Sequence, residues 1–77
     1  MRIEILGPGC AKCALLGKHA DAAARALGLD YELTYVKEIP DILARGVMST
    51  PAMAVDGVVK VQGHVPTSRH IEKLLLG

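Results

Sequence analysis

The stretch GPGCAKC, residues 7–13, decides the fold of this 77-residue chain. It holds both cysteines of the sequence, Cys10 and Cys13, with two residues between them. Glycine and proline interrupt regular structure, so Gly7, Pro8 and Gly9 predict a turn. A dithiol that follows a turn and opens a helix has the context in which a C-x-x-C pair carries redox chemistry.

The residues on both sides of this turn predict a strand before it and a helix after it. Residues 1–6 place Ile3 and Ile5 on one face with Glu4 between them, the alternation of a strand, and we interpret Glu4 as a solvated polar position. In residues 11–27, apolar side chains recur every three or four positions, the spacing of one helical face, and Gly28 follows as the C-terminal cap.

The rest of the chain predicts three strands and two short helices. Residues 31–36 alternate and are rich in β-formers, whereas residues 40–44 begin with a proline suited to a first helical turn. The pair Asp56-Gly57 favours a tight hairpin, and Thr67 can cap a last helix whose buried stripe is Ile71, Leu74 and Leu75. The hairpin strands are residues 52–55 and 58–62.

We therefore expect a single α/β domain over residues 1–77, in the order strand, helix, strand, helix, strand, strand, helix. No repeat or linker interrupts it. The net charge of +1 gives no basic stripe for a nucleic acid, and no apolar run is long enough to span a membrane. We expect a soluble, cytoplasmic monomer without nucleic-acid or membrane partners.

The two cysteines are expected to differ in role. A disulfide across so small a ring restricts the unfolded chain by only about 2 kcal/mol, so reactivity explains the pair better than stapling. Cys10 precedes the apolar face at the helix start, where backbone N–H groups stabilise a thiolate, and Lys12 should lower its pKa further. Cys13 continues the apolar face. We therefore expect Cys10 to be the nucleophile and Cys13 the resolving thiol.

The whole chain resembles the thioredoxin and glutaredoxin superfamily, through the C-x-x-C helix, Thr50-Pro51 before a strand, and a terminal helix. The closest similarity is to its shortest branch, the small redox-active disulfide proteins. The resemblance implies a thioredoxin fold with a four-stranded mixed sheet and three helices, and a thiol–disulfide oxidoreductase in electron transport and cell redox homeostasis. It implies that Thr50 and a cis Pro51 hold the substrate.

The resemblance also implies partners: disulfide-bearing protein substrates and an upstream thiol reductase, with no cofactor and no metal. The sequence departs from the superfamily in two places. Ala11 and Lys12 stand between the cysteines, without the aromatic residue that precedes them in typical thioredoxins. Residues 63–66 read Gly-His-Val-Pro, where glutaredoxins carry Gly-Gly-x-Asp. Glu4 lies six residues before Cys10, the offset of a buried acid in many thioredoxins.

Two other classes of function remain open at this point. Copper-carrying domains present C-x-x-C before a first helix, and zinc could bind both cysteines with His64 and His70. The element order differs from the copper domains, and the ligand spacing is poor for zinc, so we interpret His19, His64 and His70 as surface residues. A non-catalytic interaction domain would differ from both in having unreactive thiols.

Overall fold

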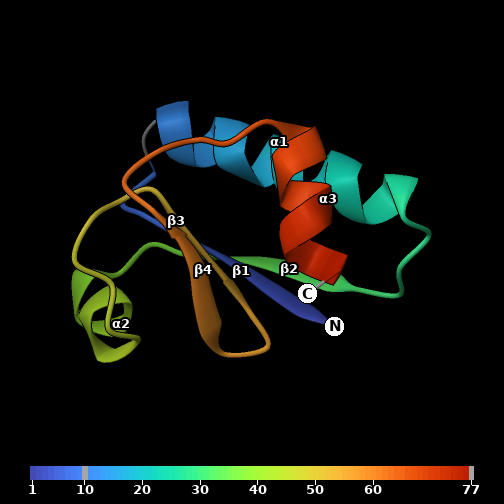
Figure 1. Ribbon diagram of the computed structural model, residues 1–77. Helices are drawn as coiled ribbons and strands as arrows, with labels where there is room; N and C mark the ends of the chain where they lie inside the picture. The colour runs from blue at the N-terminus through green and yellow to red at the C-terminus, as the bar shows by residue number, and fades with distance from the viewer. Residues whose placement is uncertain (10, 77) are drawn as a thin grey trace.

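The computed structural model describes residues 1–9 and 11–76, which form one four-stranded sheet with three helices (Figure 1). The element order is the one that the sequence predicts, with bounds that differ by one residue at several ends. The elements are β1 (Arg2–Leu6), α1 (Ala11–Ala26), β2 (Glu32–Val36), α2 (Ile39–Ala44), β3 (Ala52–Val55), β4 (Val58–Gln62) and α3 (Ser68–Leu76).

The strands lie in the order β2-β1-β3-β4, so the first strand of the chain is inside the sheet. β1 pairs in parallel with β2 and antiparallel with β3, and β3 pairs antiparallel with β4. The sheet is therefore mixed, as the resemblance implies. Ile3 of β1 lies opposite Leu33 of β2 on one side and Val55 of β3 on the other, and these pairs define the register of the three strands.

The hairpin between β3 and β4 has the predicted turn. Asp56 and Gly57 have φ values of 50° and 86°, and a two-residue turn of this kind matches the right-handed twist of its strands. The turn is also tied to β1, because the backbone N–H of Arg2 donates to the Asp56 carboxylate at 2.8 Å. At the other end of the hairpin, the N–H of Gly63 donates to the carbonyl of Pro51 at 2.9 Å.

Helices cover both faces of the sheet, but unequally. α1 and α3 pack together over one face, while α2 lies over the other (Figure 1). The larger cluster includes Ile3, Ile5, Leu16, Met53 and Ile71. The smaller cluster consists of Leu6, Ile42, Val47, Ala52 and Ala54.

The last helix begins as predicted. The hydroxyl of Thr67 accepts a hydrogen bond from the backbone N–H of His70 at 3.2 Å, which is the contact of an N-cap. Ile71 and Leu75 are buried, as expected, whereas Leu74 is only partly buried.

Candidate redox site

Cys13 lies in the first turn of α1 with its side chain only 3% exposed. Its thiol fits against the end of β1 because residue 7 is glycine. A Cβ added at Gly7 would overlap Cys13 Sγ and would lie 3.4 Å from Cys13 Cβ. Gly7 is itself buried and donates its N–H to the carbonyl of Val36 at 2.9 Å. The absence of a side chain here leaves the space that the sulfur occupies.

Cys10, the expected nucleophile, lies outside the described residues. Its neighbours on both sides, Gly9 and Ala11, are exposed, and so is Lys12 in the first turn of α1. These three described residues differ in exposure from Cys13, which is buried.

The residues immediately before β3, Thr50 and Pro51, belong to a segment that lies beside the contact between Gly7 and Cys13. The Thr50–Pro51 peptide bond is cis, with Thr50 exposed and Pro51 buried. A Cβ at Gly7 would be 3.8 Å from Thr50 Cβ, so Thr50 is next to the Gly7–Cys13 contact. The N–H of Met48 donates to the Gln62 side-chain amide at 3.0 Å, which ties this segment to β4.

A cavity of about 190 Å³ opens beside Cys13 and is lined by Gly7, Gly9, Cys13, Ala14, Tyr35 and Lys37. Tyr35 and Lys37 come from β2 and the residues after it, because the parallel pairing of β1 and β2 brings their ends to the same edge of the sheet. We did not expect Tyr35 near the cysteines from the sequence.

The position of Tyr35 explains a glycine within α1. A Cβ added at Gly17 would be 2.8 Å from Cζ and 2.9 Å from Cε1 of Tyr35, and its three nearest atoms all belong to that side chain. Glycine is less favourable than alanine inside a helix, so Gly17 was a signal that something approaches the helix closely. The sequence does not say which residue that is.

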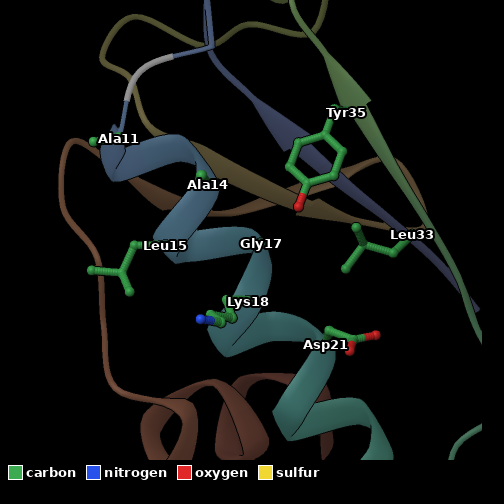
Figure 2. A pocket seen from close by; sticks show the side chains of 8 residues that line it. All are labelled: Ala11, Ala14, Leu15, Gly17, Lys18, Asp21, Leu33 and Tyr35. Atoms are coloured by element: carbon green, nitrogen blue, oxygen red, sulfur yellow. The ribbon is translucent and has the colours of Figure 1, made fainter.

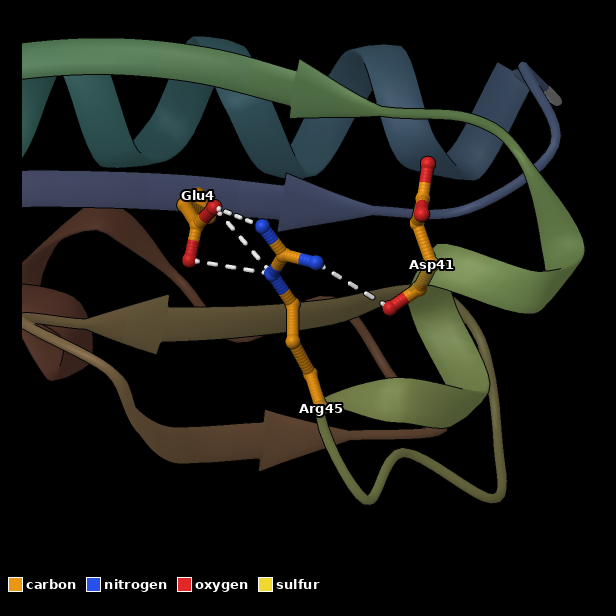
Figure 3. A network of polar contacts seen from close by, with 3 residues as sticks. All are labelled: Glu4, Asp41 and Arg45. Atoms are coloured by element: carbon orange, nitrogen blue, oxygen red, sulfur yellow. Dashed lines mark hydrogen bonds and ion pairs between the residues drawn. The ribbon is translucent and has the colours of Figure 1, made fainter.

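The interpretation of Glu4 as a solvated residue is wrong. Glu4 is 8% exposed, because β1 lies inside the sheet and its second face is covered by the region of α2. Its carboxylate accepts a hydrogen bond from Nη2 of Arg45 at 2.9 Å, and Nε of Arg45 lies 3.2 Å from the same oxygen (Figure 3).

Arg45 stands at the C-cap of α2 and is held from two sides. Besides the ion pair with Glu4, its Nη1 donates to the carbonyl of Asp41 at 3.1 Å (Figure 3). The hydrogen bond with Glu4, supported by the negative charges of Glu4 and Asp41, raises the pKa of Arg45 above its usual value. The buried Glu4 carboxylate is thus paired with the positive charge of Arg45.

The three histidines differ in their exposure. In residues 1–9 and 11–76, no three side chains of the types His, Cys, Asp and Glu are placed to hold a metal ion together. His64 and His70 are exposed, as expected. His19 is partly buried instead, with Nδ1 at 2.8 Å from the carbonyl of Pro66, because the chain passes over α1 on its way to α3.

Within the part of the chain that the structure describes, no helix is long and apolar enough to cross a bilayer. The sheet order, the cis proline before β3 and the cysteine at the start of α1 define the class: an α/β protein with the thioredoxin fold.

Comparison with known proteins agrees with that class. The family model described as "Thioredoxin domain" matches residues 1–76, so the chain belongs to the thioredoxin family. It is 43% identical over 75 residues to a thioredoxin of Methanothermobacter thermautotrophicus, with 97% of each chain covered. It is 34% identical over 73 residues to a thioredoxin of Methanocaldococcus jannaschii, covering 95% of this chain and 84% of that one.

Membership of this family makes the chain a thiol–disulfide oxidoreductase. Proteins of this class act on disulfide-bearing proteins and are in turn reduced by a reductase partner.

Proposed function

We propose that this chain reduces protein disulfides by dithiol–disulfide exchange, with Cys10 as the attacking sulfur and Cys13 as the resolving sulfur. The observation that carries this assignment is the burial of Cys13 against Gly7. A cysteine that is 3% exposed is poorly accessible to a disulfide in another protein, so its expected partner is the other cysteine of the C-x-x-C pair, three positions earlier in the sequence.

The reaction has two exchange steps. The Cys10 thiolate attacks one sulfur of the substrate; a bond forms between them, the substrate disulfide breaks, and the other substrate sulfur leaves as a thiolate that takes a proton from solvent. Cys13, after losing its proton, then attacks Cys10 Sγ. The Cys10–Cys13 disulfide forms, the mixed disulfide breaks, and the first substrate sulfur leaves as a thiolate and is protonated.

The net result is the transfer of two electrons and two protons from the dithiol to the substrate. An upstream thiol reductase then returns the Cys10–Cys13 disulfide to the dithiol. We expect this cycle in the cytoplasm, where thiols are kept reduced, and in a single-domain monomer of residues 1–77.

Three further residues support the exchange in this proposal. Lys12, exposed in the first turn of α1, places a positive charge near the attacking thiolate and favours it over the neutral thiol. Thr50, exposed beside the Gly7–Cys13 contact, offers its backbone to an extended substrate, with buried Pro51 behind it.

Trapping variants test the assignment directly. Cys13→Ser should accumulate a mixed disulfide between Cys10 and a disulfide-bearing protein such as insulin, because no sulfur is left to release it. Cys10→Ser is the matched control and should trap nothing. Non-reducing electrophoresis and mass spectrometry identify the adducts. Adducts on Cys10→Ser but not on Cys13→Ser would invert the two roles, and adducts on neither would overturn the proposal.

A further inference from the structure

A groove runs between α1 and β2 on the side of the molecule that carries the cavity beside Cys13. It encloses about 510 Å³, and its walls include Leu15 and Lys18 from α1 and Leu33 from β2 (Figure 2). The groove and the smaller cavity share Ala14 and Tyr35 as lining residues. A ligand can therefore extend from the neighbourhood of Cys13 along the helix.

The groove has an aromatic wall in a defined position. Tyr35 is 49% exposed, yet its ring does not project freely into solvent: it lies across α1 with the hydroxyl pointing toward the helix near Gly17 (Figure 2). A glycine in the helix interior leaves room for that ring, although alanine is the more favourable helix residue. A half-exposed aromatic ring held this way presents one apolar face to a ligand.

Three charged residues line the groove and the adjoining cavity beside Cys13: Lys18 and Asp21 in the groove, and Lys37 in the cavity. Lys18 and Lys37 are exposed, and neither takes part in the two ion pairs of the described chain, Arg25–Asp21 and Arg45–Glu4. Asp21 also lines the groove, but its carboxylate is 3.1 Å from Arg25 Nε and accepts a hydrogen bond from Tyr31. The negative charge of Asp21 is therefore balanced by Arg25, whereas the positive charges of Lys18 and Lys37 are available to pair with a ligand.

The length of the groove favours an extended peptide. Its helical wall reaches from Ala11 to Asp21, which corresponds to about 15 Å along the axis of an α-helix. An extended chain advances about 3.3 Å per residue, so the groove accommodates roughly four or five residues.

We propose that this groove, together with the adjoining cavity beside Cys13, binds an acidic polypeptide segment next to the disulfide of a protein substrate. Lys37 and Lys18 pair with carboxylates of that segment, and Tyr35 packs against its apolar parts. The inference rests on the proposed function, since it names the substrates that the same dithiol reduces. Chains with acidic residues beside their disulfide are then reduced faster than chains with basic ones.

The test uses short peptides of equal length with a central cysteine carried as a 2-pyridyl mixed disulfide. The residues on both sides of the cysteine are glutamate, glutamine or lysine, and each rate with the reduced protein is divided by the rate with dithiothreitol. Two exposed ion pairs should make the glutamate peptide react about tenfold faster than the lysine peptide at low ionic strength. Added salt should reduce that ratio because it screens exposed charges.

Two double variants with the same change in net charge separate the groove from the charge of the whole molecule. Lys18→Glu with Lys37→Glu should reverse the order of the peptides. Lys60→Glu with Lys73→Glu, at exposed positions on β4 and α3, should keep it. Equal rates for the glutamate and lysine peptides, or reversal in both double variants, would overturn the inference while leaving the proposed function intact. No reaction with any peptide would overturn the proposed function.

Binding without chemistry gives an independent readout. A glutamate peptide with serine in place of cysteine should shift the amide NMR signals of Ala14, Lys18 and Tyr35. Shifts confined to Met48 and Thr50 would place the peptide outside the groove and contradict the inference.

Discussion

Replacing Gly17 with alanine should test whether α1 depends on glycine because of Tyr35. In the interior of a helix this change ordinarily stabilises a protein by about 1 kcal/mol, since alanine restricts the unfolded backbone and shields the helix. Here the new Cβ would be 2.8 Å from Tyr35 Cζ, so the ring has to move off the helix. The gain in helix propensity is then offset by the lost contact.

The expected change in the free energy of unfolding follows from comparing Gly17→Ala in the protein with Tyr35 and in the Tyr35→Ala variant. With Tyr35→Ala, the space beside residue 17 is empty, and Gly17→Ala should give the full gain of about 1 kcal/mol, a rise in Tm of roughly 4–8 °C for a domain of this size. With Tyr35 present, the gain should fall below about 0.5 kcal/mol or change sign, because contacting residues couple by roughly 0.5–3 kcal/mol.

Urea unfolding followed by far-UV circular dichroism, with a reductant present throughout, measures all four proteins of this cycle. Ala22→Gly is the matched control: it is an exposed position in the same helix and should lose about 1 kcal/mol in both backgrounds. Equal stabilisation by Gly17→Ala with and without Tyr35 would refute the reasoning, because it would mean that the ring does not rest on residue 17.

Three further results are expected. Gly7→Ala should destabilise the protein by about 1–3 kcal/mol through overpacking against Cys13 Sγ, and Cys13→Ala should remove most of that loss, as urea unfolding would show. Cys10 should be alkylated by iodoacetamide much faster than Cys13 in the reduced native protein; equal rates by mass spectrometry would contradict the protection expected from the burial of Cys13. Arg45→Met should destabilise the protein more than Arg25→Met does, because it leaves the buried Glu4 carboxylate without its counterion, whereas Asp21 stays in contact with solvent; equal losses in urea unfolding would argue against it.

The order of the elements could be predicted because each boundary has a local cause. Asp56-Gly57 supplies the backbone that a two-residue hairpin needs, and Thr67 supplies an oxygen where the last helix has unpaired N–H groups. The burial of Cys13 also follows from local spacing, since it continues the apolar face of its own helix.

What could not be predicted depends on contacts between distant elements. Glu4 alternates with apolar neighbours, a pattern that indicates one solvated face, but β1 is an interior strand with both faces covered. Its partner Arg45 is 41 residues away, so no local rule links them. Glycine is an unfavourable residue inside a helix, but the contact of Gly17 with Tyr35, which lies on another element, is visible only in the structure.

The helices that cover the two faces of the sheet should differ in how readily they detach from it by local unfolding. Leu6, Ile42, Val47, Ala52 and Ala54 form a small apolar layer, and α2 above it has only the six residues Ile39–Ala44, with Ile42 as its buried member. Few buried contacts mean a low free energy of local opening, so hydrogen exchange should be fast in α2 and slow in the sheet under α1 and α3. Each such opening separates Arg45 from Glu4 and gives water brief access to the interior carboxylate. The sheet can thus take up solvent from the α2 side while the packing of α1 on the opposite face persists.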